Sequence, residues 1–174
     1  MSAILAGRVP DVVSGCLEAC RRCDAVVASL IEKDPTRYPV VGPHLRHCIE
    51  HFRLLLEGWR AGEVDYDARP RETGLERDPG SARAALAEIS SELSGLATAD
   101  LGRGFFISQS AAPGRPPVSS PTFLDRELLF LSSHTIHHIA IMVLAARVAG
   151  VEIPTALAVA YSTAAHHESL VTNG

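Results

Sequence analysis

The sequence lacks the features that mark nucleic-acid-binding, membrane and secreted proteins. Its formal net charge is -4, so it has no excess of basic residues to bind a phosphate backbone. No uninterrupted apolar run approaches the roughly 18 residues that cross a bilayer. The first residues, MSAILAGRVPDVV, also lack the charged start and long apolar stretch of a signal peptide. We therefore expect a cytoplasmic protein with neither nucleic acid nor a membrane as its partner.

Common catalytic fingerprints are missing as well. The chain contains no G-x-S-x-G motif, no P-loop and no Rossmann glycine pattern. These absences exclude the usual signatures of a serine hydrolase and of a nucleotide-binding fold. Any catalytic chemistry must come from other residues.

Cysteine is scarce, and three of the four cysteines fall in one short stretch. Cys16, Cys20 and Cys23 have the C-x3-C-x2-C spacing with which radical-SAM enzymes hold an iron–sulfur cluster, but those enzymes carry it on a loop of a larger barrel. Here the spacing follows one stripe of an amphipathic helix, where free cysteine packs as a small apolar residue. We expect three reduced core cysteines without iron or sulfide.

The apolar pattern predicts an all-α fold in one domain that spans residues 1–174. Four principal helices are predicted, over residues 10–33, 41–61, 79–97 and 122–149. Their apolar stripes are typical of an antiparallel four-helix bundle, in which ligand sites are built from side chains on facing helices.

Shorter elements complete the prediction. Residues 62–80 are polar and predict a connection across one end of the bundle. The Gly-, Pro- and Ser-rich stretch 98–121 predicts a small hairpin or an ordered loop. Three residues offer N-terminal capping for the helix over 122–149: Ser120, Pro121 and Thr122. Gly150 should end that helix, and a short last helix is expected after Pro154.

Histidine is the residue type that stands out. The chain has eight histidines, and six of them fall in two of the predicted helices. The helix over 41–61 carries three of them, within about 60° of one another at 100° per residue: His44, His47 and His51. In the helix over 122–149, His134 and His138 share a face, and His137 lies off it.

An i, i+4 histidine pair can present two imidazoles to one metal ion, as the H-E-x-x-H zinc helices do. A third imidazole from a facing helix makes a three-histidine site with open positions, and neutral imidazole suits zinc, nickel, iron or copper. The alternative is packing, since a single histidine near a core is usually a hydrogen-bonded packing residue. Two inward-facing clusters favour metal binding, because each buried imidazole must satisfy its polar atoms. His166 and His167 point in different directions and are not expected to be ligands.

Two segments resemble a known family. The stretch SSHTIHHIAIM, after the acidic RELLF, resembles the helix-borne histidine motif of the DinB-like (DinB/YfiT) metalloenzyme family, and VVGPHLRHCIEHFRLLL is similar to that family's other ligand segment. The resemblance spans most of the chain. It implies a four-helix bundle that holds a divalent metal, zinc or nickel, through one histidine of the second helix and an H-x-x-x-H pair. It also implies thiol-dependent chemistry, since members resemble transferases and an isomerase that use bacterial low-molecular-weight thiols.

Carried over by position, the resemblance assigns the metal to His47, His134 and His138. The helical wheel instead places His44 closest to the centre of the apolar arc, and His51 stacks one turn below His47. Both remain alternates for the third ligand.

Glu127 lies seven residues before His134 and could orient an imidazole or bind a water molecule. It could equally be a first-turn glutamate that is favoured by the helix dipole. Three further polar residues could line a pocket or face solvent: Tyr161, Ser162 and Thr163. Cys48 points about 100° away from His47 and is not expected to be a ligand.

These residues favour a metal-dependent enzyme that acts on a small molecule, with thiol S-transferase-like or hydrolase-like chemistry. Two other functions stay open. One is a non-catalytic metal-binding or stress-associated bundle that acts through a protein partner, and the other is a metal-free bundle whose histidines serve packing. A low-molecular-weight thiol as cofactor and assembly as a homodimer are further hypotheses.

Overall fold

The computed structural model describes residues 9–172, and this part of the chain is predominantly helical. It contains six α-helices and a small sheet. The four longest helices are α1 (Asp11–Lys33), α2 (Tyr38–Gly58), α4 (Pro79–Gly95) and α5 (Leu124–Val148). Two shorter ones are α3 (Thr73–Arg77) and α6 (Tyr161–Thr172).

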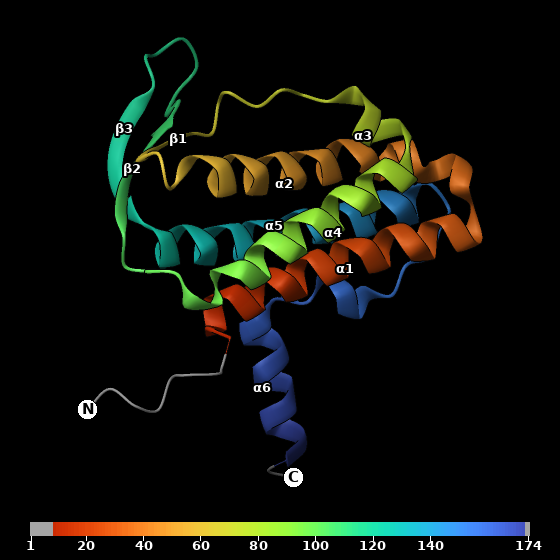
Figure 1. Cartoon of the computed structure of the whole chain (residues 1–174). Coiled ribbons are helices and arrows are strands. Elements are labelled where there is room, and N and C mark those ends of the chain that lie inside the picture. The colour runs from red at the N-terminus through yellow and green to blue at the C-terminus, as the bar shows by residue number, and fades with distance from the viewer. Residues whose placement is uncertain (1–8, 173–174) are drawn as a thin grey trace.

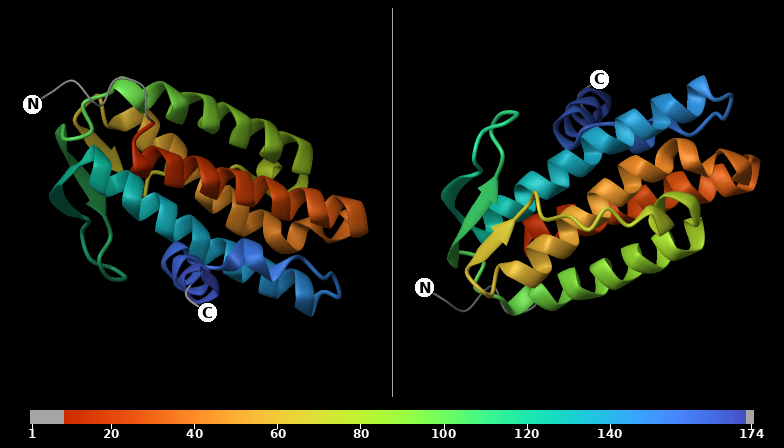
Figure 2. Two further views of the ribbon diagram at one scale, coloured as in Figure 1. Left: turned by 90° about the horizontal axis from the view of Figure 1, so that it is seen from below. Right: turned by 90° about the horizontal axis from the view of Figure 1, so that it is seen from above.

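The four long helices pack around a shared apolar core, with α1 against α4 and α5, and α2 against the same two helices (Figure 1). Figure 2 shows that α1 and α5 run in one direction while α2 and α4 run in the other. The predicted antiparallel arrangement is therefore wrong for two neighbouring pairs, α1 with α5 and α2 with α4. The physical reason is the connection over residues 59–78, which returns the chain along α2, so that α4 starts at the same end as α2 does.

A three-stranded sheet covers one end of the helices. Its strands are β1 (Glu63–Asp65), β2 (Gly104–Gln109) and β3 (Val118–Phe123), in the order β1-β2-β3. β2 and β3 form the predicted hairpin, with Phe106 opposite Pro121. β1 pairs in parallel with β2, which places Glu63 opposite Phe106. This third strand was not predicted, because three residues inside a polar connection carry too little pattern.

Several predicted helix ends agree with the structure. α4 begins at Pro79, and the Asp78 carboxylate accepts a hydrogen bond of 2.9 Å from the Gly80 N–H. α5 ends before Gly150, whose φ of 86° turns the chain so that the Val151 N–H reaches the Ala146 carbonyl at 2.9 Å.

Other predicted ends are wrong. The proposed capping residues Ser120, Pro121 and Thr122 belong to β3, and Phe123 precedes α5 without a side-chain cap. α2 begins at Tyr38, three residues early, because a proline is tolerated in its first turn. The last helix begins only at Tyr161, after a 3₁₀ turn over Thr155–Ala158.

The cysteines of α1 lie in the core, as predicted. Cys16, Cys20 and Cys23 are at most 1% exposed and are free thiols. The Cys16 Sγ donates a hydrogen bond of 3.1 Å to the Leu128 carbonyl of α5. Their burial follows from the amphipathic stripe, and the absence of iron and sulfide stays a prediction.

α5 is long and apolar enough to cross a membrane, by length and composition alone. Its most apolar window has a mean hydropathy of 1.6, and 44% of that window is buried inside the protein. Histidines and serines interrupt this window, so it contains no long uninterrupted apolar run. A core helix that packs on α1 and α2 has the same composition.

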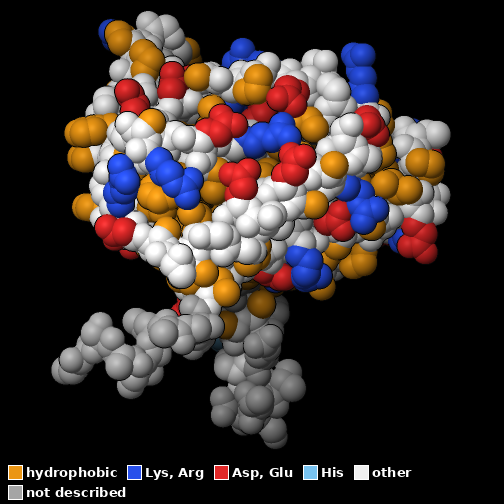
Figure 3. Space-filling model, in the orientation of Figure 1, with side chains coloured by type: hydrophobic (Ala, Val, Ile, Leu, Met, Phe, Trp, Pro, Cys, Tyr) orange, Lys and Arg blue, Asp and Glu red, His pale blue; other side chains and the backbone are white. Residues whose placement is uncertain are grey.

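On the face shown in Figure 3, acidic and basic side chains are interspersed. Arg83 of α4 pairs with Asp24 of α1 at 2.6 Å, and Arg53 of α2 pairs with Glu72 at 3.2 Å. Exposed pairs of this kind add little stability each. They leave no single-sign patch on this face.

Gly42 fixes how closely α3 can approach α2. A Cβ built on Gly42 would lie 2.2 Å from the Glu76 carbonyl oxygen, which belongs to the backbone of α3. Backbone cannot move aside as a flexible side chain can, so glycine is required at this crossing.

We expect Gly42→Ala to lower the free energy of unfolding by about 2 kcal/mol or more, because overpacking outweighs the better helix propensity of alanine. Urea unfolding followed by circular dichroism measures the change. Gly95→Ala is the matched control, since no atom outside its own helix backbone and chain neighbours lies within 4 Å of a Cβ at Gly95. Equal stability of the two variants would contradict the tight crossing.

Candidate metal centre

The antiparallel pair α2 and α5 brings five histidines together. Three come from α2 and two from α5, and the two helices pair them along their lengths. His47 Nε2 lies 2.9 Å from His134 Nε2, and His44 Nδ1 lies 3.2 Å from His138 Nδ1. The clustering predicted from the spacing of the histidines is therefore present, with the imidazoles of the two helices facing one another.

Three of these side chains are positioned close enough to bind one metal ion. His47, His51 and His134 each offer a ring nitrogen, and these nitrogens lie within 4.8 Å of one another. Two of them belong to the predicted ligand set, and His51 was an alternate. Zinc held by imidazoles at about 2.0–2.1 Å in a tetrahedron separates their nitrogens by about 3.3 Å. The distance of 2.9 Å between His47 Nε2 and His134 Nε2 is close to that separation.

His138, the remaining predicted ligand, lies beside this group. Its ring centroid is 4.5 Å from that of His47 and 4.6 Å from that of His134, while its Nδ1 faces His44. Its role as a ligand stays a prediction. His137 is exposed, with its ring 5.5 Å from that of His138.

His166, one of the two histidines near the C-terminus, lies outside the cluster. His166 is exposed on α6. The side chain of His167 lies outside the described part of the structure.

His51 is oriented as a metal ligand usually is. Only 5% of it is exposed, and its Nδ1–H donates a hydrogen bond of 2.8 Å to the His47 carbonyl. This bond fixes the tautomer and leaves the Nε2 lone pair available. Tyr66 stacks on its other side, with ring centroids 5.3 Å apart.

Arg69 makes the least expected contact in the cluster. It lies in the connection between β1 and α3, where its Nε donates to the Tyr66 carbonyl at 3.2 Å and one terminal nitrogen contacts His47 Nδ1. The guanidinium forms no ion pair with any carboxylate within residues 9–172. It therefore brings an unpaired positive charge to the histidines.

A buried glutamate of α2 holds this connection in place. Glu50 is fully buried, and it accepts hydrogen bonds of 3.0 Å from Arg46 and 2.8 Å from the Glu72 N–H. Figure 1 shows the connection running beside α2. Sequence reasoning missed Arg69 and Tyr66, because an irregular connection has no periodicity that indicates where its side chains point.

Glu127 acts on the site through Tyr66. It is fully buried, and its oxygens accept hydrogen bonds from three donors: Tyr66 at 2.9 Å, Thr122 at 2.7 Å and Arg126 at 2.8 Å. It also lies in the first turn of α5, as the helix-dipole alternative predicted. By holding the Tyr66 hydroxyl, it fixes the ring that stacks on His51.

The environment favours neutral imidazoles. Burial, followed by the charges of neighbouring groups, lowers the pKa of His47 to about 3. Burial also lowers the pKa of His51 and of His138 to about 4, and it lowers the pKa of His44 and His134. The rings are therefore neutral near pH 7, which is the form that metal binding requires.

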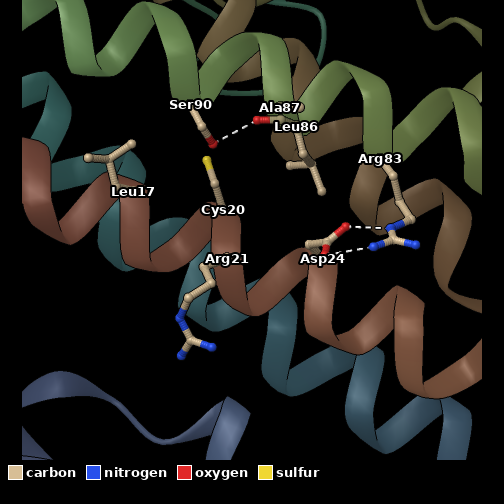
Figure 4. Close-up of a pocket in the computed structure, with 8 residues that line it drawn as sticks. All are labelled: Leu17, Cys20, Arg21, Asp24, Arg83, Leu86, Ala87 and Ser90. Carbon is tan, nitrogen blue, oxygen red and sulfur yellow. Dashed lines mark hydrogen bonds and ion pairs between the residues drawn. The ribbon is translucent and has the colours of Figure 1, made fainter.

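Other candidate positions lie away from this cluster. A hollow of about 470 Å³ opens between α1 and α4, where Arg83 pairs with Asp24 (Figure 4). The sulfur at its base belongs to Cys20, and burial raises the pKa of this thiol to about 12, which leaves it unreactive. Tyr161 donates to the Gly15 carbonyl at 2.9 Å on α1. Two further polar residues of α6 are exposed: Ser162 and Thr163.

Comparison of the chain with family models, with curated proteins and with solved structures finds no match. The geometry of the histidine cluster therefore carries the functional argument.

We expect the metal-free protein to lose stability as the pH falls from about 6.5 toward about 4. An unfolded histidine has a pKa of about 6.5, so the unfolded chain binds more protons than the fold in this window. Each extra proton lowers the free energy of unfolding by about 1.4 kcal/mol per pH unit. Urea unfolding with a chelator at several pH values measures the slope. His51→Gln should give a shallower slope, and equal wild-type stability at pH 7 and pH 4.5 would contradict the prediction.

Proposed function

We propose that the protein is a metal-dependent enzyme of the DinB-like kind, in which the four long helices form the family's four-helix bundle. His47 and His134 are the ligands common to the resemblance and to the geometry. His51 is the third ligand that the distances favour, and His138 is the one that the resemblance favours.

The observation that carries this proposal is the convergence of His47, His51 and His134 within 4.8 Å. Packing alone would satisfy the imidazoles with backbone carbonyls. Only His51 makes such a bond among the hydrogen bonds of the five clustered rings, and the others meet nitrogen to nitrogen between helices. Ring nitrogens that meet between two helices are placed where one cation could take their lone pairs in exchange for the shared proton.

The donor set suits zinc or nickel, because all three ligands are imidazoles that are neutral near pH 7. Three protein ligands leave a position open, as in catalytic rather than structural sites. A divalent metal with an open position lowers the pKa of a bound water molecule or thiol, which then becomes a nucleophile near neutral pH.

The residues of the chain supply orientation and partial shielding from solvent. His51 is held by the His47 carbonyl and by Tyr66, while His47 and His134 are half-buried and give solvent partial access. These features favour a small-molecule substrate. A low-molecular-weight thiol is the nucleophile that the resemblance favours, and water is its counterpart in a hydrolase.

A second candidate function follows from His44 and His138. Their imidazoles lie next to the three-histidine group, and His138 can complete a four-histidine site without an open position. Such a closed site favours a non-catalytic metal-binding or stress-associated protein that acts through a protein partner.

The metal content of single variants tests both functions. We expect protein purified without an affinity tag to carry about one zinc or nickel per chain by mass spectrometry. His47→Ala and His134→Ala should retain less than about a tenth of it, because each removes a ligand from a three-donor site. His137→Ala, on the exposed side of α5, is the matched control and should retain it all.

The third ligand is decided in the same experiment. Metal loss in His51→Ala but not in His138→Ala supports the group that the distances favour, and the reverse supports the resemblance. Loss in both variants supports the closed site. A wild-type protein without metal would contradict every form of the proposal.

A further inference from the structure

Arg69 forms no direct ion pair in the described part of the structure, although the charge of Arg69 contributes to lowering the pKa of the Asp67 carboxyl. Neighbouring arginines do form ion pairs, since Arg46 pairs with Glu50 and Glu76, and Arg53 pairs with Glu72 and Glu88. Arg69 instead donates its hydrogen bonds to the Tyr66 carbonyl and to His47 Nδ1. A half-buried guanidinium without a carboxylate is unusual, because burying an unpaired charge is costly.

The contact with His47 fixes the tautomer of that ring. A guanidinium only donates hydrogen bonds, so His47 Nδ1 carries the lone pair and Nε2 carries the proton that faces His134. A metal ion held at His47 Nε2 needs the lone pair on Nε2. The ring proton then moves to Nδ1, and Arg69 loses its acceptor.

The charges around the cluster also favour an anion beside Arg69. The buried carboxylates already have donors: Glu127 accepts from Tyr66, Thr122 and Arg126, and Glu50 accepts from Arg46 and from the Glu72 N–H. Asp67, whose charge acts on both Arg69 and His51, accepts from the Ser110 N–H at 2.6 Å. The three imidazoles are neutral. A divalent cation together with Arg69 brings three positive charges against the single negative charge of Asp67, and an anion stabilises this excess positive charge in a half-buried site.

We propose that Arg69 binds the carboxylate of a small anionic substrate at the histidine cluster. This inference rests on the proposed metal site and adds the substrate class to it. The planar fork of arginine matches a carboxylate with two parallel hydrogen bonds. The bond from Arg69 Nε to the Tyr66 carbonyl holds the guanidinium at the cluster after it leaves His47.

Cobalt(II) at the proposed metal site reports the binding of an anion through its visible absorption. The full chain is loaded with cobalt, and its visible absorption is followed during titration with acetate and, separately, with acetamide, which has the same shape without the charge. We expect saturable binding of acetate to the wild type and at least tenfold weaker binding to Arg69→Gln, because the charged hydrogen bonds are lost. The cobalt content of Arg69→Gln should equal or exceed that of the wild type, since a repelling charge has gone.

Two controls keep the result specific. Arg71→Gln removes an exposed charge from the same connection and should bind acetate as the wild type does. Arg69→Lys keeps the charge without the planar fork, and its acetate affinity should lie between those of the wild type and Arg69→Gln. The same variant replaces Arg69→Gln if circular dichroism shows that Arg69→Gln does not fold.

The outcomes separate this inference from the proposed function. Equal acetate affinity in the wild type and Arg69→Gln, no acetate binding to the cobalt protein, or loss of cobalt in Arg69→Gln would each overturn the role of Arg69. A wild-type protein that takes up no cobalt would instead overturn the metal site itself.

Discussion

Every imidazole buried between α2 and α5 needs a partner for each of its two ring nitrogens, and this requirement governs the region. Burial keeps the rings neutral, so each ring has one donor and one acceptor to satisfy. His51 meets the requirement with a backbone carbonyl on one side. His47 meets it only with the help of Arg69 and His134. A bound cation relieves the same requirement by taking several lone pairs at once.

The connection over residues 59–78 does more than join two helices. It delivers Tyr66 to His51 and Arg69 to His47, and two fully buried carboxylates hold it in place. Glu50 binds its backbone near α3, and Glu127 binds the Tyr66 hydroxyl near the sheet. Buried carboxylates of this kind are stable only with several donors, so the connection and the helices depend on each other.

The helical part of the fold and the histidine faces were predictable, because both depend on a period of 3.6 residues. That period identified α1 and the burial of its cysteines, and it placed the α2 histidines opposite those of α5. The direction of neighbouring helices was not predictable, since it depends on the path of an irregular connection. The three histidines that lie closest together include His51 in place of the predicted His138. This difference depends on the register of α2 against α5, which a helical wheel does not contain. β1 and Arg69 were missed because they lie where the sequence has no repeating pattern.

The order of the helices along the chain also has a consequence for assembly during synthesis. The Cys16 thiol meets the Leu128 carbonyl across 112 positions, and His47 meets His134 across 87. Contacts between such distant segments form late, because long loops must close first. During synthesis, the three histidines of α2 therefore leave the ribosome well before the histidines of α5 are made. The group of His47, His51 and His134 can therefore form only after α5 has left the ribosome.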